Sequence, residues 1–146
     1  MGRINFDEYC YTDVCVEKLL KTYKERGYLI IAFDFDDTLI SSEPDYECQL
    51  PLRLLSLCKE YINCKLILYT CRSSNRGDGR NLRRAIETCK NLGIEPDYVN
   101  EHAYEEFKGL DGKVFYDIFL DDKAGLGQAC EILGLVINKI LNNEDI

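Results

Sequence analysis

The chain has 146 residues, of which 46% are apolar and 30% charged, and its formal net charge is −8. This length and apolar content predict one folded domain spanning residues 1–146 rather than a disordered or low-complexity chain. The acidic balance disfavours a general polyanion-binding surface, which requires a basic patch or stripe.

The eight cysteines are scattered without a CxxC pair, and the first residues, MGRINFDEYCYTDV, lack the apolar run of a signal peptide. We therefore expect reduced thiols, most of them small core residues, and neither a disulfide framework nor a zinc site. No stretch approaches the roughly 20 apolar residues that a membrane-spanning helix requires. These features predict a cytoplasmic protein without membrane contact.

Hydrophobic periodicity predicts helices and strands that alternate along the chain. The expected elements are a helix over 12–26, a strand over 28–33, a helix over 51–61, a strand over 65–70, a helix that ends at Gly93, a strand over 98–100, a strand over 115–120 and a helix over 123–141. Residues 1–27 should form an N-terminal helical extension packed on the domain, and residues 41–49 a short polar connection.

This alternation predicts an α/β fold, namely a Rossmann-like doubly wound parallel sheet with helices on both faces. In such sheets, ligands bind beyond the carboxyl ends of the strands, at the point where the strand order reverses. Polar residues that directly follow strands are therefore the first candidates for a functional site.

Acidic residues follow two of the predicted strands. In FDFDDTL, Asp34, Asp36 and Asp37 come directly after an apolar strand, and a polar turn rarely needs three acids in four positions. Asp121 and Asp122 end the strand over 115–120, where they would by themselves equally suit a helix cap. Because both strand ends reach the same edge of the sheet, the two clusters together predict a magnesium site, since Mg²⁺ prefers carboxylate oxygens and a substrate phosphate.

Four segments occur in a defined order over residues 28–125: YLIIAFDFDDTL, LILYT, a lysine, and IFLDD. They resemble the four motifs of the haloacid dehalogenase (HAD-like) superfamily of phosphohydrolases, in its small form without a sizeable cap domain. The resemblance implies a magnesium-dependent phosphatase that acts through an aspartyl-phosphate intermediate.

By this resemblance, Asp34 is the nucleophile, and its other carboxylate oxygen is a magnesium ligand. Asp36 is the acid and base of the reaction, and its backbone carbonyl is a further metal ligand. Asp121 completes the metal shell, and Asp122 acts there through water or by orienting other groups. Thr70 donates its hydroxyl to a phosphoryl oxygen.

The lysine of this pattern has two candidates, because both Lys108 and Lys113 precede the final acidic pair. Lys113 lies closer to the strand and is favoured as the catalytic lysine, which offsets charge on the phosphoryl group, while Lys108 stays open as a substrate contact. Arg72, which follows LILYTC, can fork onto a substrate phosphate. Neither Cys71 nor His102 has a sequence neighbour that would activate it.

The chain has little room for a cap domain, so the resemblance implies a relatively open site. Such a site favours large or tethered phosphorylated substrates, among them nucleotides, sugar phosphates and nucleic-acid ends, or a homo-oligomer in which a neighbouring subunit forms the lid. A non-catalytic phosphate-binding, magnesium-binding or protein-interaction module on the same fold stays open, as does a phosphotransferase. A receiver domain also gathers acids around magnesium, but its acidic pair comes first in the chain, whereas here the pair comes last.

Overall fold

The computed structural model describes residues 10–42, 44–74, 77, 81–104, 106 and 114–142. Its elements in chain order are α1 (Thr12–Arg26), β1 (Leu29–Phe33), β2 (Ile40–Ser42), β3 (Asp45–Glu47), α2 (Gln49–Tyr61), β4 (Cys64–Leu68), α3 (Leu82–Asn91), β5 (Tyr98–Val99), β6 (Ile118–Leu120) and α4 (Leu126–Leu141). Helices and strands alternate as predicted, which confirms the mixed α/β class.

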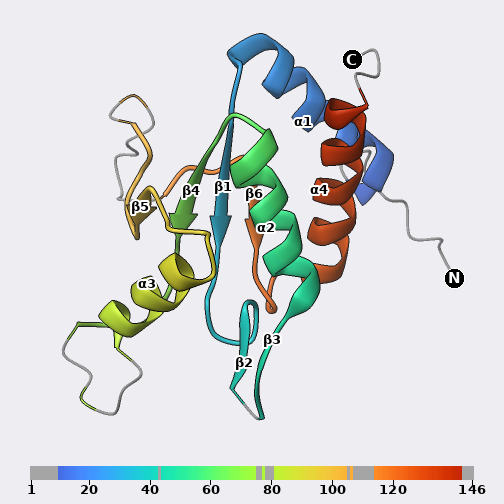
Figure 1. Ribbon diagram of the computed structural model, residues 1–146. Coiled ribbons are helices and arrows are strands. Elements are labelled where there is room, and N and C mark those ends of the chain that lie inside the picture. The colour runs from blue at the N-terminus through green and yellow to red at the C-terminus, as the bar shows by residue number, and fades with distance from the viewer. Residues whose placement is uncertain are drawn as a thin grey trace, which may run out of the picture.

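Four strands form one parallel sheet in the order β5-β4-β1-β6 (Figure 1). Phe33 of β1 is in register with Leu68 of β4 and Leu120 of β6, so these three strands end at the same level. The chain runs from β1 to β4 and β5 on one side, then returns to β6 on the other side of β1. The strand order therefore reverses between β1 and β6, the kind of position where α/β sheets bind ligands.

Side chains of β1 alternate between the two faces of the sheet, as the pleat of a strand requires. Leu29, Ile31 and Phe33 join the main hydrophobic core, to which all four helices contribute. Ile30 and Ala32 join a second cluster on the opposite face. The other members of that cluster are Ile67, Ala103, Val114, Tyr28, Tyr98, Tyr104, Tyr116 and Phe119.

The helices cover one face of the sheet, which differs from the prediction of helices on both faces. In the part of the chain that the structure describes, no helix contributes to this second cluster, so the expected helices on both faces are found on one face only. Aromatic side chains cover the other face instead, and the rings of Tyr28 and Tyr104 meet edge to face with centroids 5.5 Å apart. These rings bury apolar area there without a helix.

The helices follow their predicted boundaries closely, with one exception. α1 has the predicted bounds, and Gly27 ends it in the left-handed conformation at φ 91°, which costs glycine little. α4 begins at Leu126, three residues later than predicted. The delay arises because Asp121 forms a turn of its own, in which its carboxylate accepts the backbone N–H of Lys123 at 3.0 Å.

Strand β6 is shorter than the predicted strand over 115–120 because an aspartate side chain occupies its start. The carboxylate of Asp117 accepts the backbone N–H of Ile30 at 2.7 Å and forms an ion pair with Arg26. Asp97 takes the equivalent role before β5, where its carboxylate accepts the backbone N–H of Leu66 at 2.8 Å. Each aspartate satisfies a main-chain donor that a longer strand would have paired.

The segment between β1 and α2 holds a small antiparallel pair of strands that the sequence did not reveal. β2 pairs with β3 within residues expected to form only a polar connection. The three residues of β3 are exposed, and β2 is half-buried at its two ends. This β2–β3 hairpin lies beyond the carboxyl ends of β1, β4 and β6 (Figure 1) and is far smaller than a cap domain.

All eight cysteines are free thiols, as expected from their spacing. Cys58 of α2, Cys89 of α3 and Cys130 of α4 are buried in the main core. Burial disfavours the charged thiolate and raises the pKa of each of these three thiols, that of Cys89 to about 12.

Candidate active site

The central strand delivers Asp34 to the point where the strand order reverses. Asp34 directly follows β1, and its backbone N–H donates to the carbonyl of Leu120 at 2.9 Å. This bond continues the pairing of β1 with β6 and sets Asp34 beside Asp121, the first residue after β6. The two acidic clusters predicted from the sequence therefore meet.

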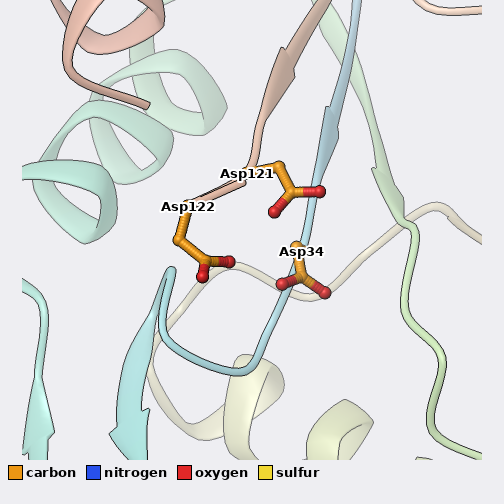
Figure 2. A group of neighbouring side chains, drawn as sticks. All are labelled: Asp34, Asp121 and Asp122. Carbon is orange, nitrogen blue, oxygen red and sulfur yellow. The ribbon is translucent and has the colours of Figure 1, made fainter. Parts of the chain in front are cut away.

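Asp34, Asp121 and Asp122 form the acidic cluster of the site. One carboxylate oxygen from each residue lies within 4.8 Å of the other two. Figure 2 shows the three side chains turned toward a shared space from the ends of β1 and β6. Three hard oxygen donors with room for water and phosphate ligands suit magnesium, so these residues fit the predicted metal. This convergence is confirmed, while the identity of the cation stays a prediction.

The environment of Asp34 disfavours its charge in the absence of a cation. Burial is the main cause that raises the pKa of Asp34 to about 6, and the carboxylates of Asp121, Asp122 and Asp36 raise it further. A hydrogen bond from the backbone of Phe35 acts in the opposite direction. A divalent cation between these carboxylates would offset their mutual repulsion and favour the ionised form.

Burial also raises the pKa of Asp122, and its hydrogen bond and charge interaction with Asp121 act in the same direction. The hydroxyl of Thr38 lowers it. Thr38 is fully buried, and its Oγ accepts the backbone N–H of Asp122 at 3.0 Å. The threonine of FDFDDTL thus ties the turn after β1 to the acidic pair after β6, a role that sequence reasoning missed.

A tight turn follows Asp34 and leads into the β2–β3 hairpin. The carbonyl of Phe35 accepts the backbone N–H of Leu39 at 2.9 Å, and Asp37 has the left-handed conformation at φ 61°. The carboxylate of Asp37 accepts the backbone N–H and the hydroxyl of Ser42 at 2.9 and 2.8 Å. The third acid of the motif therefore anchors the end of β2 next to the hairpin turn and does not belong to the acidic cluster.

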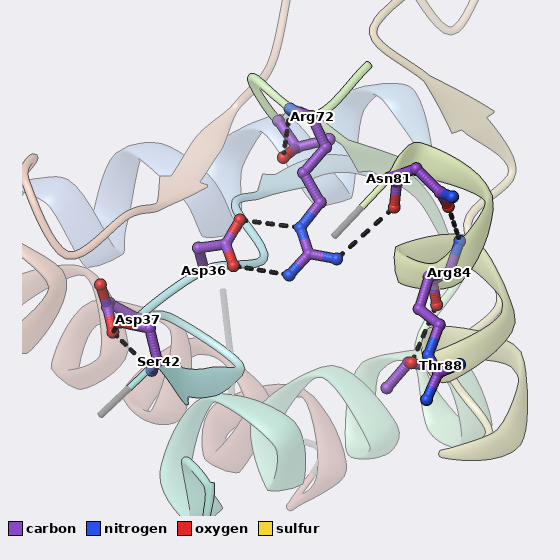
Figure 3. Close-up of polar contacts among 8 residues, drawn as sticks. Asp36, Asp37, Ser42, Arg72, Asn81, Arg84 and Thr88 are labelled. Carbon is purple, nitrogen blue, oxygen red and sulfur yellow. Dashed lines mark hydrogen bonds and ion pairs between the residues drawn. The ribbon is translucent and has the colours of Figure 1, made fainter. Parts of the chain in front are cut away.

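The side chain of Asp36 has a different partner from the acidic cluster. Its two carboxylate oxygens accept hydrogen bonds from Arg72, at 2.9 Å from Nε and 2.7 Å from Nη2 (Figure 3). Any contribution of Asp36 to a metal shell would thus come from its backbone carbonyl, as the resemblance implies. The guanidinium of Arg72 thus donates to both carboxylate oxygens of Asp36, and its contact with a substrate phosphate stays a prediction.

Thr70 lies at the same edge of the sheet, just after β4. Its backbone N–H donates to the side-chain carbonyl of Asn100 at 2.8 Å, and its Oγ accepts the backbone N–H of Arg72 at 3.2 Å. The hydroxyl proton is not used by either bond and can be donated to a phosphoryl oxygen. Asn100, which sequence reasoning missed, positions this threonine from the end of β5, where its own backbone is left-handed at φ 53°.

The remaining sequence candidates add little to the site. Lys108 and Lys113 lie outside the described residues, so the choice between them stays a prediction. Cys71 is exposed and His102 is half-buried, and neither belongs to the acidic cluster.

The raised pKa of Asp34 predicts a specific pH dependence of stability in metal-free protein. The unfolded chain binds this proton with a pKa of about 3.9, whereas the folded chain has a pKa of about 6, so folding takes up a proton between these values. The stabilisation is fully present below the unfolded pKa and is lost as the pH rises through about 6. We expect the free energy of unfolding to fall by ~1–2 kcal/mol across this window, after allowance for the half-exposed position of Asp34.

Urea unfolding at pH 4.5 and pH 7 in the presence of EDTA measures this dependence. Other carboxylates also titrate in this window, so the informative quantity is the difference between the native chain and Asp34→Asn. The variant should lack this part of the pH dependence and be the more stable protein at pH 7. An identical pH dependence in the two proteins would contradict the electrostatic account of the cluster.

Comparisons of the chain with models of protein families, with curated proteins and with solved structures return no match. Among the helices that the structure describes, none is long and apolar enough to cross a membrane.

Proposed function

We propose that the protein is a magnesium-dependent phosphohydrolase of the haloacid dehalogenase type, which releases phosphate from a phosphomonoester through an aspartyl-phosphate on Asp34. The observation that carries the proposal is the meeting of Asp34, Asp121 and Asp122 within 4.8 Å, where the strand order reverses. Asp36 lies two residues beyond the proposed nucleophile and is held by Arg72. The order and spacing of these residues match the motifs on which the resemblance rests.

In the proposed first step, a carboxylate oxygen of Asp34 attacks phosphorus and forms the aspartyl-phosphate. The bond from phosphorus to the leaving oxygen breaks, and Asp36 gives that oxygen a proton. In the second step, Asp36 takes a proton from water, which attacks phosphorus and releases phosphate from Asp34. A carboxyl group that serves as acid and then as base returns the protein to its starting state.

Several groups are available to stabilise the charge that develops. Magnesium, held by Asp34, Asp121, Asp122 and the backbone carbonyl of Asp36, would neutralise anionic oxygens of the phosphoryl group. Thr70 would donate its free hydroxyl proton to the same group. Lys113, or Lys108 in its place, would add a positive charge.

The segment between β1 and α2 bears on the class of substrate. It contributes the small β2–β3 hairpin rather than a cap domain. This supports the relatively open approach to Asp34 that the resemblance implies. An open approach suits large or tethered phosphorylated substrates such as nucleotides, sugar phosphates or nucleic-acid ends. A homo-oligomer in which a neighbouring subunit covers the site is compatible with the same geometry.

A second candidate function is a phosphate- or magnesium-binding module without catalysis. One observation favours it: both carboxylate oxygens of Asp36 already accept hydrogen bonds from Arg72, so the proposed acid and base has a strong partner at rest. This module would bind magnesium at the acidic cluster and hold a phosphorylated partner without turnover. The two functions predict different results in a single assay.

The assay measures phosphate release from a broad panel of phosphomonoesters, with magnesium and with EDTA, for the native chain and Asp34→Asn. The proposed function requires release that depends on both magnesium and Asp34, and the best panel member then identifies the substrate class. Calorimetry with magnesium alone supplies the second readout. Magnesium binding without release from any ester would favour the binding module instead.

A further inference from the structure

The side chain of Arg72 contacts three other residues beside the proposed site. Its guanidinium forks onto Asp36 and donates through Nη1 to the carbonyl of Asn81 at 3.5 Å. The Cζ atom lies 4.6 Å from the centroid of the Phe35 ring, in the arrangement of a cation–π contact. The side chain of Arg72 is only 10% exposed, and Figure 3 shows its guanidinium between Asp36 in the turn after β1 and Asn81 at the start of α3.

This arrangement differs from that of an arginine whose N–H groups are available to bind a phosphate. A substrate-binding guanidinium points its N–H groups at the phosphate, whereas Arg72 donates the N–H of Nε and one N–H of Nη2 to Asp36. Transfer of Arg72 to a phosphate would break a bidentate ion pair and the contact with Phe35, and the loss of one partner from a buried pair is strongly unfavourable. The contacts of Arg72 therefore point to a role exerted on Asp36.

The partner of this ion pair keeps the freedom that proton transfer needs. Arg72 donates one N–H to each carboxylate oxygen of Asp36, and each oxygen retains a further lone pair. The side chain of Asp36 is 43% exposed, so the remaining lone pairs are open to solvent or to a bound ester. The orientation of the Asp36 carboxylate is thus fixed, while its remaining lone pairs stay accessible.

We propose that Arg72 is a positioning residue that aims the carboxyl group of Asp36 at the leaving oxygen of the substrate. The inference rests on the proposed function and assigns Arg72 no contact with the phosphoryl group. Asp34 and Asp36 share one short turn, and Arg72 anchors the far side of that turn to the end of β4 and to α3. The proton of Asp36 then passes to the leaving oxygen as the bond from that oxygen to phosphorus breaks.

The leaving group offers a readout specific to this role. An alkyl phosphate expels a strongly basic alkoxide and needs a proton from the acid, whereas p-nitrophenyl phosphate expels a weakly basic phenolate that needs little help. A variant that misplaces Asp36 should therefore lose activity on the alkyl ester selectively. Loss of a phosphate ligand, or of folded protein, lowers both activities by the same factor.

The experiment measures kcat/KM at saturating magnesium for p-nitrophenyl phosphate and for the best alkyl phosphomonoester of the panel. The proteins are the native chain, Arg72→Gln, Arg72→Lys, Asp36→Asn, and Arg83→Gln as control, since Arg83 is 85% exposed on α3. We expect Arg72→Gln to lose ~10²-fold on the alkyl ester and less than ~5-fold on the nitrophenyl ester, with the same selectivity in Asp36→Asn. The loss of Arg72→Lys on the alkyl ester should be smaller than that of Arg72→Gln but still measurable. An ammonium group keeps the positive charge but cannot form the bidentate pair with the carboxylate of Asp36.

The double variant Asp36→Asn with Arg72→Gln tests whether the two residues act as a unit. Its loss on the alkyl ester should equal that of Asp36→Asn alone, because Arg72 has nothing to position once the carboxyl is gone. The ratio of the two activities within one preparation is independent of how much of a destabilised variant is folded.

Two outcomes would overturn the positioning role while leaving the proposed function intact. One is an equal loss on both esters with a raised KM, which identifies Arg72 as a phosphate ligand. The other is an additive loss in the double variant. If the native chain hydrolyses neither ester, the proposed function itself is contradicted, and the positioning role of Arg72 is contradicted as well.

Discussion

Asp34→Asn should abolish magnesium-dependent phosphate release, with a loss of ~10³-fold or more in kcat. The amide nitrogen of asparagine is no nucleophile toward phosphorus, and its oxygen is neutral, so the variant loses both the covalent step and one charge of the acidic cluster. No other carboxylate of the cluster can replace it without moving the phosphoryl group. The measurement is phosphate release from the best ester of the panel, at saturating magnesium and neutral pH.

A matched control for this loss is Asp13→Asn, which makes the same chemical change at an exposed position in the first turn of α1. That variant should retain native activity. The loss in Asp34→Asn should occur in a folded protein, because removing a half-buried charge stabilises the metal-free chain. Native-like turnover by Asp34→Asn would rule out the aspartyl-phosphate mechanism.

Asp117→Ala should lower the free energy of unfolding by ~3–4 kcal/mol, a large part of the ~5–15 kcal/mol that a domain of this kind possesses. The side chain of Asp117 is 8% exposed, accepts the N–H of Ile30 and pairs with Arg26. Alanine leaves a main-chain donor of the central strand unsatisfied and removes the counter-charge of a partly buried guanidinium. Urea unfolding followed by far-ultraviolet circular dichroism measures the change.

Two further variants separate the contributions within this effect. Asp97→Ala removes the equivalent acceptor before β5, at an exposed residue, and should cost about 1 kcal/mol. Asp117→Asn keeps an oxygen that can accept the N–H of Ile30 and loses only the negative charge. Its loss of unfolding free energy should therefore fall between those of Asp97→Ala and Asp117→Ala. An effect of Asp117→Ala no larger than that of Asp97→Ala would show that the ion pair with Arg26 contributes nothing.

Much of the fold was predictable because buried strands and amphipathic helices have distinct periods. β1 is a run of five fully buried residues, and α1 ends at a glycine, which are strong local signals. The convergence of Asp34 with Asp121 and Asp122 was predictable too, because the carboxyl ends of parallel strands meet at one edge. Their chemical roles stay predictions, as does the family.

Other features could not be predicted because they depend on contacts between distant residues. The β2–β3 hairpin consists of two three-residue strands without an apolar alternation to announce them. The start of β6 depends on which way the side chain of Asp117 turns. The ion pair of Asp36 with Arg72 joins residues 36 positions apart, and it depends on the register of β1 with β4, which brings the two strand ends to the same level.

The positions of the cysteines allow local unfolding of the protein to be measured by thiol alkylation. Cys10 and Cys71 are exposed and open to an alkylating reagent in the folded state. Cys58, Cys89 and Cys130 each lie on the buried face of a different helix, and their raised pKa values suppress the reactive thiolate. Modification of each buried thiol therefore requires its own helix to detach, so peptide-resolved alkylation rates would rank the opening of α2, α3 and α4 without any engineered probe.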